Sequence, residues 1–221
     1  MCEREPAMRP LLAASLVFAL TTGSLVVACS SSTTPSAQPA ADRGSSGDPE
    51  DGGGTDDGGA QPAGPMTLTS SAFEASDALP SKYTCDNTSK KDVSPPLSWT
   101  AGPEGTASYA IVFTDETNPL VHAAIYDIPA NVTSLPEGVE EVYAPSDPAG
   151  AHQSLNYKKL SGYAGPCPPD GEHSYMFTLY ALKVATLTGL TKDSTASAAK
   201  TAIVGQKLGS TTLKTKYTLA K

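Results

Sequence analysis

The chain alternates between short apolar runs and clusters of proline, glycine and aspartate, which is typical of β-structure. The run Ser108–Asp115 is apolar along most of its length and predicts a strand that is buried on both faces. A second run, His122–Pro129, ends at a proline that cannot continue a ladder, and a third covers Ser174–Val184. A shorter stretch, Met66–Thr69, begins the series. Many short strands separated by turn residues predict a mainly-β fold, an antiparallel sandwich.

The C-terminal part of the chain has a different pattern. Thr191–Ser194 offers helix-capping side chains, and the alanine-rich segment Ala196–Val204 predicts a helix of about three turns. We expect a second short helical segment after Gly205 and then a closing strand over Leu213–Leu219. The prediction is therefore a β-sandwich with short helices near its C-terminus.

The first 28 residues have the pattern of an export signal. Two arginines precede the apolar run Leu11–Val27, which ends in small residues before Cys29. Val26–Cys29 resembles a bacterial lipobox, which implies that Cys29 carries lipid and anchors an exported protein to the membrane. Ser30 after the cysteine favours the outer membrane, facing the periplasm or the cell surface. The alternative is a permanent anchor helix, which the serine and threonine residues in the run disfavour.

The next segment, residues 29–65, is rich in Ser, Thr, Pro, Ala, Gly and Asp and contains no aromatic residue. Such a segment cannot bury enough apolar surface to offset its chain entropy, so we predict a disordered, acidic tether. Residues 66–221 are long enough for one domain with a substantial core.

The predicted domain is acidic and lacks arginine. Residues 66–221 contain 12 Lys, 8 Asp and 7 Glu, a net charge of −3 within the −8 of the whole chain. Because there is no basic run, we expect no nucleic-acid partner. Because arginine usually supplies the bidentate fork for phosphate, any anion site here must use histidine, tyrosine and backbone N–H groups.

Two cysteines remain in the domain once Cys2 and Cys29 are assigned to the signal and the lipid anchor. An exported protein matures in an oxidising compartment, so we predict a disulfide between Cys85 and Cys167. Two free thiols are the alternative. Two cysteines far apart in the sequence do not make a zinc site, and we predict no metal and no cofactor.

The candidate chemistry lies in the loop Gly165–Tyr175, where prolines and glycines restrict the backbone. His173 and Tyr175 are two residues apart at the start of an apolar run, and strand residues with this spacing face the same side. The loop therefore predicts a small ligand pocket.

Several motifs, taken together and in this order, identify the domain as similar to a known family. They are Tyr83–Asp86, Ser94–Trp99, Pro103–Thr106, Asp115, Asn118–Pro119, His122, Ile128–Ala130, Gly165–Pro169 and His173–Tyr175. The domain resembles the phosphatidylethanolamine-binding protein family, in its bacterial Raf-kinase-inhibitor-like branch. The resemblance implies a sandwich of one large and one small antiparallel sheet, with an anion-binding pocket at one end.

The resemblance also implies which residues form that pocket. The ligand-binding residues it assigns are Asp115, Pro119, His122, Gly165, Pro166, His173 and Tyr175. Their chemistry suits a small anionic ligand, such as a phosphate group. The chain departs from the family where Thr117 replaces an aspartate and where Val121 and Ala123 replace aromatic neighbours of His122, so we expect a more open pocket wall.

Other roles for these residues stay open at this stage. Asp115 could simply cap the turn at Asn118, His122 could be satisfied by local carbonyls, and His152 is expected to be solvated. Trp99 is expected to pack in the core.

We weigh three functions. The first is a lipid-anchored binding protein, and the second is a regulator, such as a kinase or protease inhibitor, that contacts a protein partner through the polar loops Asp86–Asp92 and Ala144–Tyr163. The third is a hydrolase, for which Ser154 lacks a recognisable catalytic motif. We therefore assign no catalytic residue.

Overall fold

A computed structural model describes residues 65–89 and 92–219. The predicted signal peptide and Cys29, the predicted site of lipid attachment, lie outside the described residues, as does the predicted tether up to residue 64.

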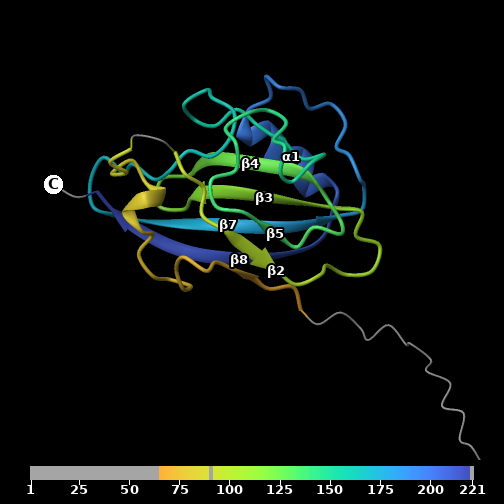
Figure 1. Ribbon diagram of the computed structural model, residues 1–221, viewed down its shortest axis with the longest axis horizontal. Coiled ribbons are helices and arrows are strands. Elements are labelled where there is room, and N and C mark those ends of the chain that lie inside the picture. The colour runs from red at the N-terminus through yellow and green to blue at the C-terminus, as the bar shows by residue number, and fades with distance from the viewer. Residues whose placement is uncertain (1–64, 90–91, 220–221) are drawn as a thin grey trace, which may run out of the picture. The chain divides into compact units, whose positions relative to one another are not determined.

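Two antiparallel sheets form the domain, as predicted (Figure 1). The large sheet has the strand order β6-β4-β3-β7-β8 and the small sheet the order β1-β2-β5. The strands of the large sheet are β6 (His152–Gln153), β4 (Leu120–Pro129), β3 (Ser108–Asp115), β7 (Glu172–Leu182) and β8 (Lys207–Thr218). Those of the small sheet are β1 (Leu68–Thr69), β2 (Leu97–Trp99) and β5 (Ser134–Leu135).

The central strand β3 is buried at every position, which explains its nearly continuous apolar sequence. Tyr109, Ile111 and Phe113 belong to the core between the two sheets. Ala110 and Val112 belong to a second core on the opposite face, where α1 packs. The alternation follows from the two-residue period of a strand and places Asp115 at the end of the row that faces the small sheet.

The helix α1 (Ala196–Gly205) confirms the prediction for this segment. Thr195 caps it, because its side chain accepts a hydrogen bond from the Ala198 N–H. Its buried residues Ala199 and Ile203 pack in the second core. One short 3-10 helix, η1 (Ser81–Tyr83), precedes the small sheet's second strand.

The predicted second helical segment after Gly205 is wrong. The residues from Lys207 onward form β8, which pairs with β7 from Leu182↔Lys207 to Glu172↔Thr218. Because the long β7 offers a complete row of backbone partners, strand pairing overrides the weak local helix preference.

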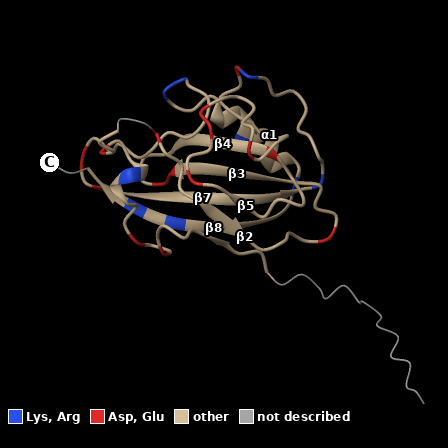
Figure 2. Ribbon diagram, viewed as in Figure 1, with Lys and Arg blue, Asp and Glu red and all other residues tan. Residues whose placement is uncertain are grey.

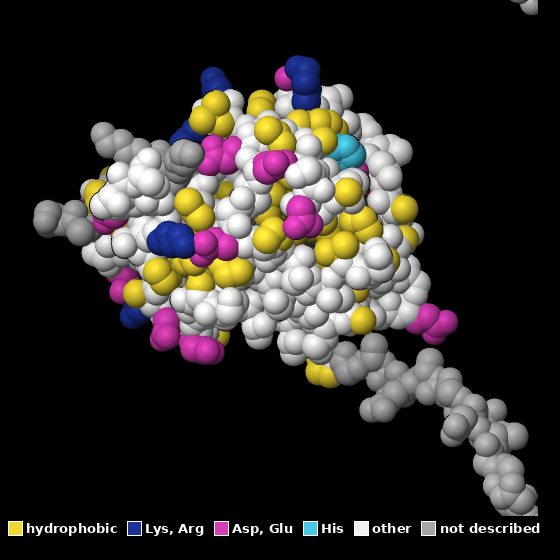
Figure 3. Space-filling model, in the orientation of Figure 1, with side chains coloured by type: hydrophobic (Ala, Val, Ile, Leu, Met, Phe, Trp, Pro, Cys, Tyr) yellow, Lys and Arg dark blue, Asp and Glu magenta, His cyan; other side chains and the backbone are white. Residues whose placement is uncertain are grey.

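Acidic and basic residues are interspersed along the described chain, with lysines on β8 (Figure 2). Figure 3 shows hydrophobic side chains that reach the surface between polar ones, and the large exposed ones include Val142 and Leu160. Trp99 is buried and packs edge-on against Tyr109, as expected for a core residue. Within the described ranges, no helix is long and apolar enough to cross a membrane.

Candidate functional site

Asp115 lies at the end of β3 and contacts two parts of the chain at once. Its Oδ2 accepts a hydrogen bond from Nδ1 of His173 on β7, at 2.7 Å. Its Oδ1 accepts the backbone N–H groups of Thr117 at 2.9 Å and Asn118 at 3.0 Å. Asp115 therefore both caps the β3–β4 turn and orients a histidine, and the two interpretations of this residue are compatible.

These contacts also determine the charge of Asp115. Burial alone would raise the pKa of its carboxyl, but hydrogen bonds from Asn118, His173 and Thr117 outweigh burial and lower that pKa. The carboxylate is thus ionised at neutral pH and acts as an acceptor, so the Nδ1 of His173 carries the donated proton.

His122 is placed by an irregularity in the sheet. β3 pairs Thr114 with Val121 and Phe113 with Ala123, which leaves His122 as an additional residue on β4. Such bulges redirect a side chain. Nδ1 of His122 donates to the carbonyl oxygen of Ala164 at 3.1 Å. The expectation of a local carbonyl is wrong, because this partner lies 42 residues further along the chain.

Burial dominates the titration of His122. It lowers the pKa of the imidazole, although the Ala164 carbonyl and the charge of Asp115 act in the opposite direction. At neutral pH the ring is therefore neutral, with a proton on Nδ1 and an acceptor lone pair on Nε2.

Four predicted side chains lie together and are nearly inaccessible to solvent. Asp115, His122, His173 and Tyr175, which we call the polar cluster, are 5%, 3%, 7% and 1% exposed. The Tyr175 ring lies 5.5 Å from the His122 ring and 6.2 Å from the His173 ring, between centroids. Burial, and then the nearby Asp115 carboxylate, raise the pKa of Tyr175, so its hydroxyl is protonated.

Phe113 forms the floor of the polar cluster. Its ring stacks on Tyr175 at 5.7 Å and meets the edge of His122 at 5.2 Å, between centroids. The polar cluster thus rests on the apolar core between the sheets, which also contains a cavity of about 40 Å³ beside Phe113. This contact excludes water from one side of the cluster.

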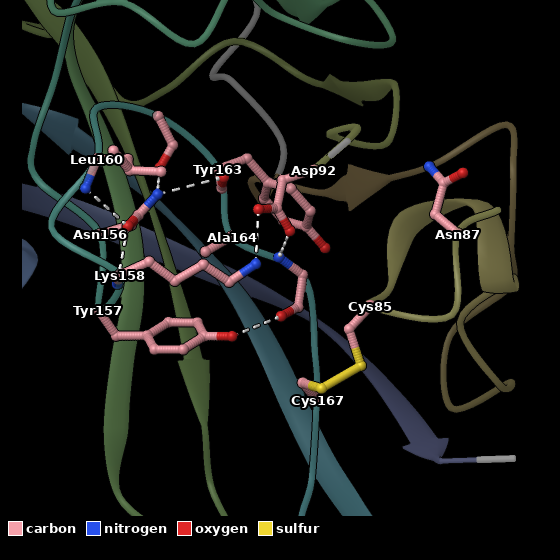
Figure 4. Close-up of polar contacts among 12 residues, drawn as sticks. Cys85, Asn87, Asp92, Asn156, Tyr157, Lys158, Leu160, Tyr163, Ala164 and Cys167 are labelled. Carbon is pink, nitrogen blue, oxygen red and sulfur yellow. Dashed lines mark hydrogen bonds and ion pairs between the residues drawn. A yellow bond between two sulfur atoms is a disulfide. The ribbon is translucent and has the colours of Figure 1, made fainter. Parts of the chain in front are cut away.

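The loop at Gly165 and Pro166 closes another side, and it is firmly held. A Cβ on Gly165 would lie 2.6 Å from the carbonyl oxygen of Tyr83, so the close approach requires glycine. The Pro166 carbonyl accepts the N–H of Cys85 at 3.0 Å. Cys85 and Cys167 form a disulfide, which links this loop to the segment after η1 (Figure 4).

Three residues that were not predicted from the sequence also enclose the polar cluster: Tyr157, Lys158 and Asp92. The Tyr157 ring meets the His122 ring edge-on at 4.7 Å between centroids, and its hydroxyl donates to the Gly165 carbonyl at 3.4 Å. The expected open wall is therefore wrong, because Tyr157 supplies the aromatic neighbour that the flanks of His122 lack. Only its position in a long polar loop, next to a lysine, could have drawn attention to it.

Pro119 is exposed in the β3–β4 turn. It lines a hollow of about 300 Å³ together with Asp115, Leu120 and Lys200. The walls of this hollow come from the end of β3, the β3–β4 turn, β4 and α1, and not from the histidines or Tyr175. The side chain of Thr117, in the same turn, accepts the Ser174 N–H at 2.9 Å and so attaches the turn to β7.

Two residues outside the polar cluster also differ from expectation. His152 is half-buried and bonds through Nδ1 to Oδ2 of Asp127 at 3.1 Å, so the expected solvated ring is wrong. Ser154 is buried, and its hydroxyl bonds to the backbone of Ala124 rather than to a histidine. Among the described residues, no group of three or more His, Cys, Asp or Glu side chains is arranged to hold a metal ion.

Comparison with known proteins identifies the protein family of the chain. The model of the phosphatidylethanolamine-binding protein family matches residues 69–218, which is more than half of the chain. The chain belongs to this family. The residues that match the family model include strands of both sheets, α1 and all members of the polar cluster.

Individual proteins are also similar to this chain in sequence. A UPF0098 protein of Methanothermobacter thermautotrophicus is 41% identical over 120 residues, which are 53% of this chain and 76% of that protein. A Mycobacterium tuberculosis protein named as lipoprotein LppC is 36% identical over 125 residues, which are 56% of this chain and 58% of LppC.

Solved structures share the fold. Escherichia coli YbcL, described as a member of the mammalian family, superposes with a TM-score of 0.63 at 25% identity and covers 71% of this chain and all of YbcL. CT736 of Chlamydia trachomatis, described as a homolog of the family, gives a TM-score of 0.59 at 30% identity, covering 71% of this chain and 99% of CT736.

Proposed function

We propose that this protein is a binding protein that holds a small anionic ligand, of the phosphate type, at the polar cluster. The observation that carries the proposal is the shared orientation of two histidines. His122 and His173 both use Nδ1 for a protein partner, the Ala164 carbonyl and the Asp115 carboxylate respectively. Both rings therefore keep Nε2 for a ligand.

The chemistry of these nitrogens suits a partly protonated anion. A neutral Nε2 accepts a hydrogen bond from a ligand hydroxyl, such as the P–OH of hydrogen phosphate, and a protonated ring donates to an anionic oxygen. The hydroxyl of Tyr175 stays protonated beside the Asp115 carboxylate and adds a further polar group to the cluster. Because these groups are buried against Phe113, each hydrogen bond forms in a medium of low dielectric and is stronger than in water.

Titration calorimetry with inorganic phosphate and with phosphoethanolamine tests this proposal. We expect His173→Ala to weaken binding by at least about tenfold, which corresponds to one charge-assisted hydrogen bond. The matched control is His152→Ala, since His152 also bonds to an aspartate but lies outside the polar cluster. Equal affinity in the wild type and His173→Ala would reject the proposal.

We also propose that the protein is exported and anchored through lipid on Cys29. The signal-like first 28 residues support this, as does the naming of the relative LppC as a lipoprotein. Cys29→Ser should move the protein from the membrane fraction to the soluble fraction and remove the mass of the lipid from the mature chain. A variant that stays in the membrane fraction with unchanged mass would contradict the anchor.

Contact with a protein partner is the second candidate function. The loops Asp86–Asp92 and Ala144–Tyr163 are joined by the Lys158–Asp92 ion pair, and the neighbouring Leu160 is 58% exposed. Leu160→Asp should release a partner that the wild type retains in cross-linking from intact cells, and an unchanged pattern would exclude this surface.

A further inference from the structure

The turn Asn156–Leu160 lies over the polar cluster and combines a fixed base with an exposed tip. At its base, the buried Asn156 accepts the N–H groups of Lys158 and Leu160 through Oδ1, at 2.9 and 3.2 Å (Figure 4). At its tip, Lys159 and Leu160 are exposed, and Lys159 has a positive φ of 63°. The turn is internally organised and has few contacts at its outer side, which suits a segment that moves as a unit.

One ion pair attaches this turn to the loop at Gly165. Nζ of Lys158 lies 2.7 Å from Oδ2 of Asp92, and Oδ1 of the same carboxylate accepts the Gly165 N–H at 2.9 Å (Figure 4). Asp92 therefore connects the turn to the loop at Gly165. The pair is only partly exposed, at 35% for the lysine side chain and 17% for the aspartate side chain.

The other side of the cluster cannot open easily. Gly165 packs against the backbone of Tyr83 and Thr84 with no room for a Cβ, and the disulfide holds Cys167. Because the cluster residues are at most 7% exposed, a ligand enters only when a covering group moves. The Tyr157–Lys158 part of the turn has no covalent cross-link and is attached by two long hydrogen bonds and one ion pair. The Tyr157 N–H donates to the His122 carbonyl at 3.3 Å, the Tyr157 hydroxyl donates to the Gly165 carbonyl at 3.4 Å, and Lys158 pairs with Asp92.

The charge balance of the site also requires a further cation. His122 is neutral at neutral pH, and Asp115 adds a negative charge beside His173. Hydrogen phosphate, which carries two negative charges and keeps one P–OH for the neutral Nε2 of His122, would then meet too little positive charge. Lys158 is the cation whose charge acts on His122, and its Nζ lies 5.7 Å from the centroid of the Tyr157 ring that covers His122.

We propose that Lys158 is a ligand-binding residue that selects doubly charged anions, exchanging the Asp92 carboxylate for the ligand as the Tyr157–Lys158 turn opens and closes over His122. This inference rests on the proposed function, because it requires an anion at the polar cluster. It names the ligand more narrowly, as doubly charged hydrogen phosphate rather than a carboxylate.

Calorimetry with inorganic phosphate and with acetate measures this selectivity. We expect Lys158→Met to weaken phosphate binding by about tenfold and acetate binding much less, since one charge-assisted contact is lost. The matched control is Lys159→Met, the adjacent lysine at the exposed tip, which should leave both affinities unchanged. Asp92→Asn should strengthen phosphate binding severalfold, because it releases Lys158 and keeps an oxygen that accepts the Gly165 N–H.

A second measurement needs no ligand. The Tyr157 ring, edge-on to His122, shifts the NMR signals of the histidine ring protons, so opening of the turn is visible in those signals. Asp92→Asn and Lys158→Met should both move the His122 signals in the direction produced by Tyr157→Leu. His122 signals and affinities that match those of Lys159→Met in both variants overturn the inference.

The outcomes separate the two proposals. If the wild type binds phosphate and His173→Ala does not, but Lys158→Met binds as Lys159→Met does, the inference fails and the proposed function stands. If His173→Ala binds as the wild type does, the proposed function fails, and the inference fails with it.

Discussion

The carboxylate of Asp115 holds the imidazole of His173 at 2.7 Å with one oxygen and closes the β3–β4 turn with the other. The same side chain thus fixes the end of a central strand and the tautomer of a histidine in the candidate site. A change at this position should affect stability and binding together.

Asp115→Asn tests this double role. The amide retains an oxygen for the turn but loses the charge that holds His173, so we expect the free energy of unfolding to fall by about 1.5–3 kcal/mol. Phosphate affinity should fall at the same time. Urea unfolding and calorimetry measure the two effects.

The control for this substitution is Asp127→Asn, which removes the carboxylate that bonds to His152 outside the polar cluster. It should lower stability without affecting phosphate binding. Loss of binding in both variants would indicate a general structural effect and contradict a specific role for Asp115.

The lowered pKa of His122 predicts how stability depends on pH. Because the folded pKa lies below the unfolded value of about 6.5, the unfolded state takes up a proton first as the pH falls. Stability should therefore be fully present above about pH 6.5 and decrease below it, by at most about 1.4 kcal/mol per pH unit for this one group. His122→Gln should reduce this slope, as measured by urea unfolding between pH 5 and 7.

Asp115 acts in a lower pH range. Its folded pKa lies below the unfolded value of about 3.9, so its contribution is present above that value and is lost as the pH falls through the folded pKa. The two ranges can be distinguished. A slope between pH 5 and 7 that is the same in the wild type and His122→Gln would contradict the assignment to His122.

Gly165 should not tolerate a side chain. The Cβ of Gly165→Ala would lie 2.6 Å from the Tyr83 carbonyl oxygen and 2.9 Å from the Thr84 Cα, and both are backbone atoms that cannot rotate away. We expect a loss of about 1–3 kcal/mol in thermal or urea unfolding. Gly205→Ala is the control, since nothing lies within 4 Å of its Cβ at the end of α1, and it should be neutral or slightly stabilising.

Removal of the disulfide should loosen the same loop. The Cys85–Cys167 bridge closes a segment of 82 residues, so Cys85→Ala/Cys167→Ala should lower the free energy of unfolding by about 2–5 kcal/mol. The wild type under reducing conditions should approach the double variant. A double variant that unfolds at the wild-type urea concentration would show that the bridge contributes nothing to stability.

Much of the fold could be predicted from the sequence because its strands are long apolar runs with clear ends. The range predicted for the central strand, Ser108–Asp115, is the observed range of β3. The start of β8 could not be predicted, because Lys207–Thr212 has little apolar character and becomes a strand only through pairing with β7.

The candidate site was predictable where it depends on local spacing and not where it depends on tertiary placement. His173 and Tyr175 share a face because they alternate with the exposed Glu172 and Ser174 on one strand. By contrast, the bulge that redirects His122 and the turn that brings Tyr157 onto it depend on segments far apart in the sequence. No local pattern specifies such contacts.

The position of the polar cluster on the neighbouring strands β4, β3 and β7 has a practical consequence. These three strands run from the cluster into both apolar cores, so their unfolding exposes the cluster and the cores in the same transition. Any compound that occupies the cluster must then raise the melting temperature of the whole domain, by an amount set by its concentration and affinity. Heating the domain with a library of metabolites would therefore rank candidate ligands directly, without a catalytic assay or a labelled compound.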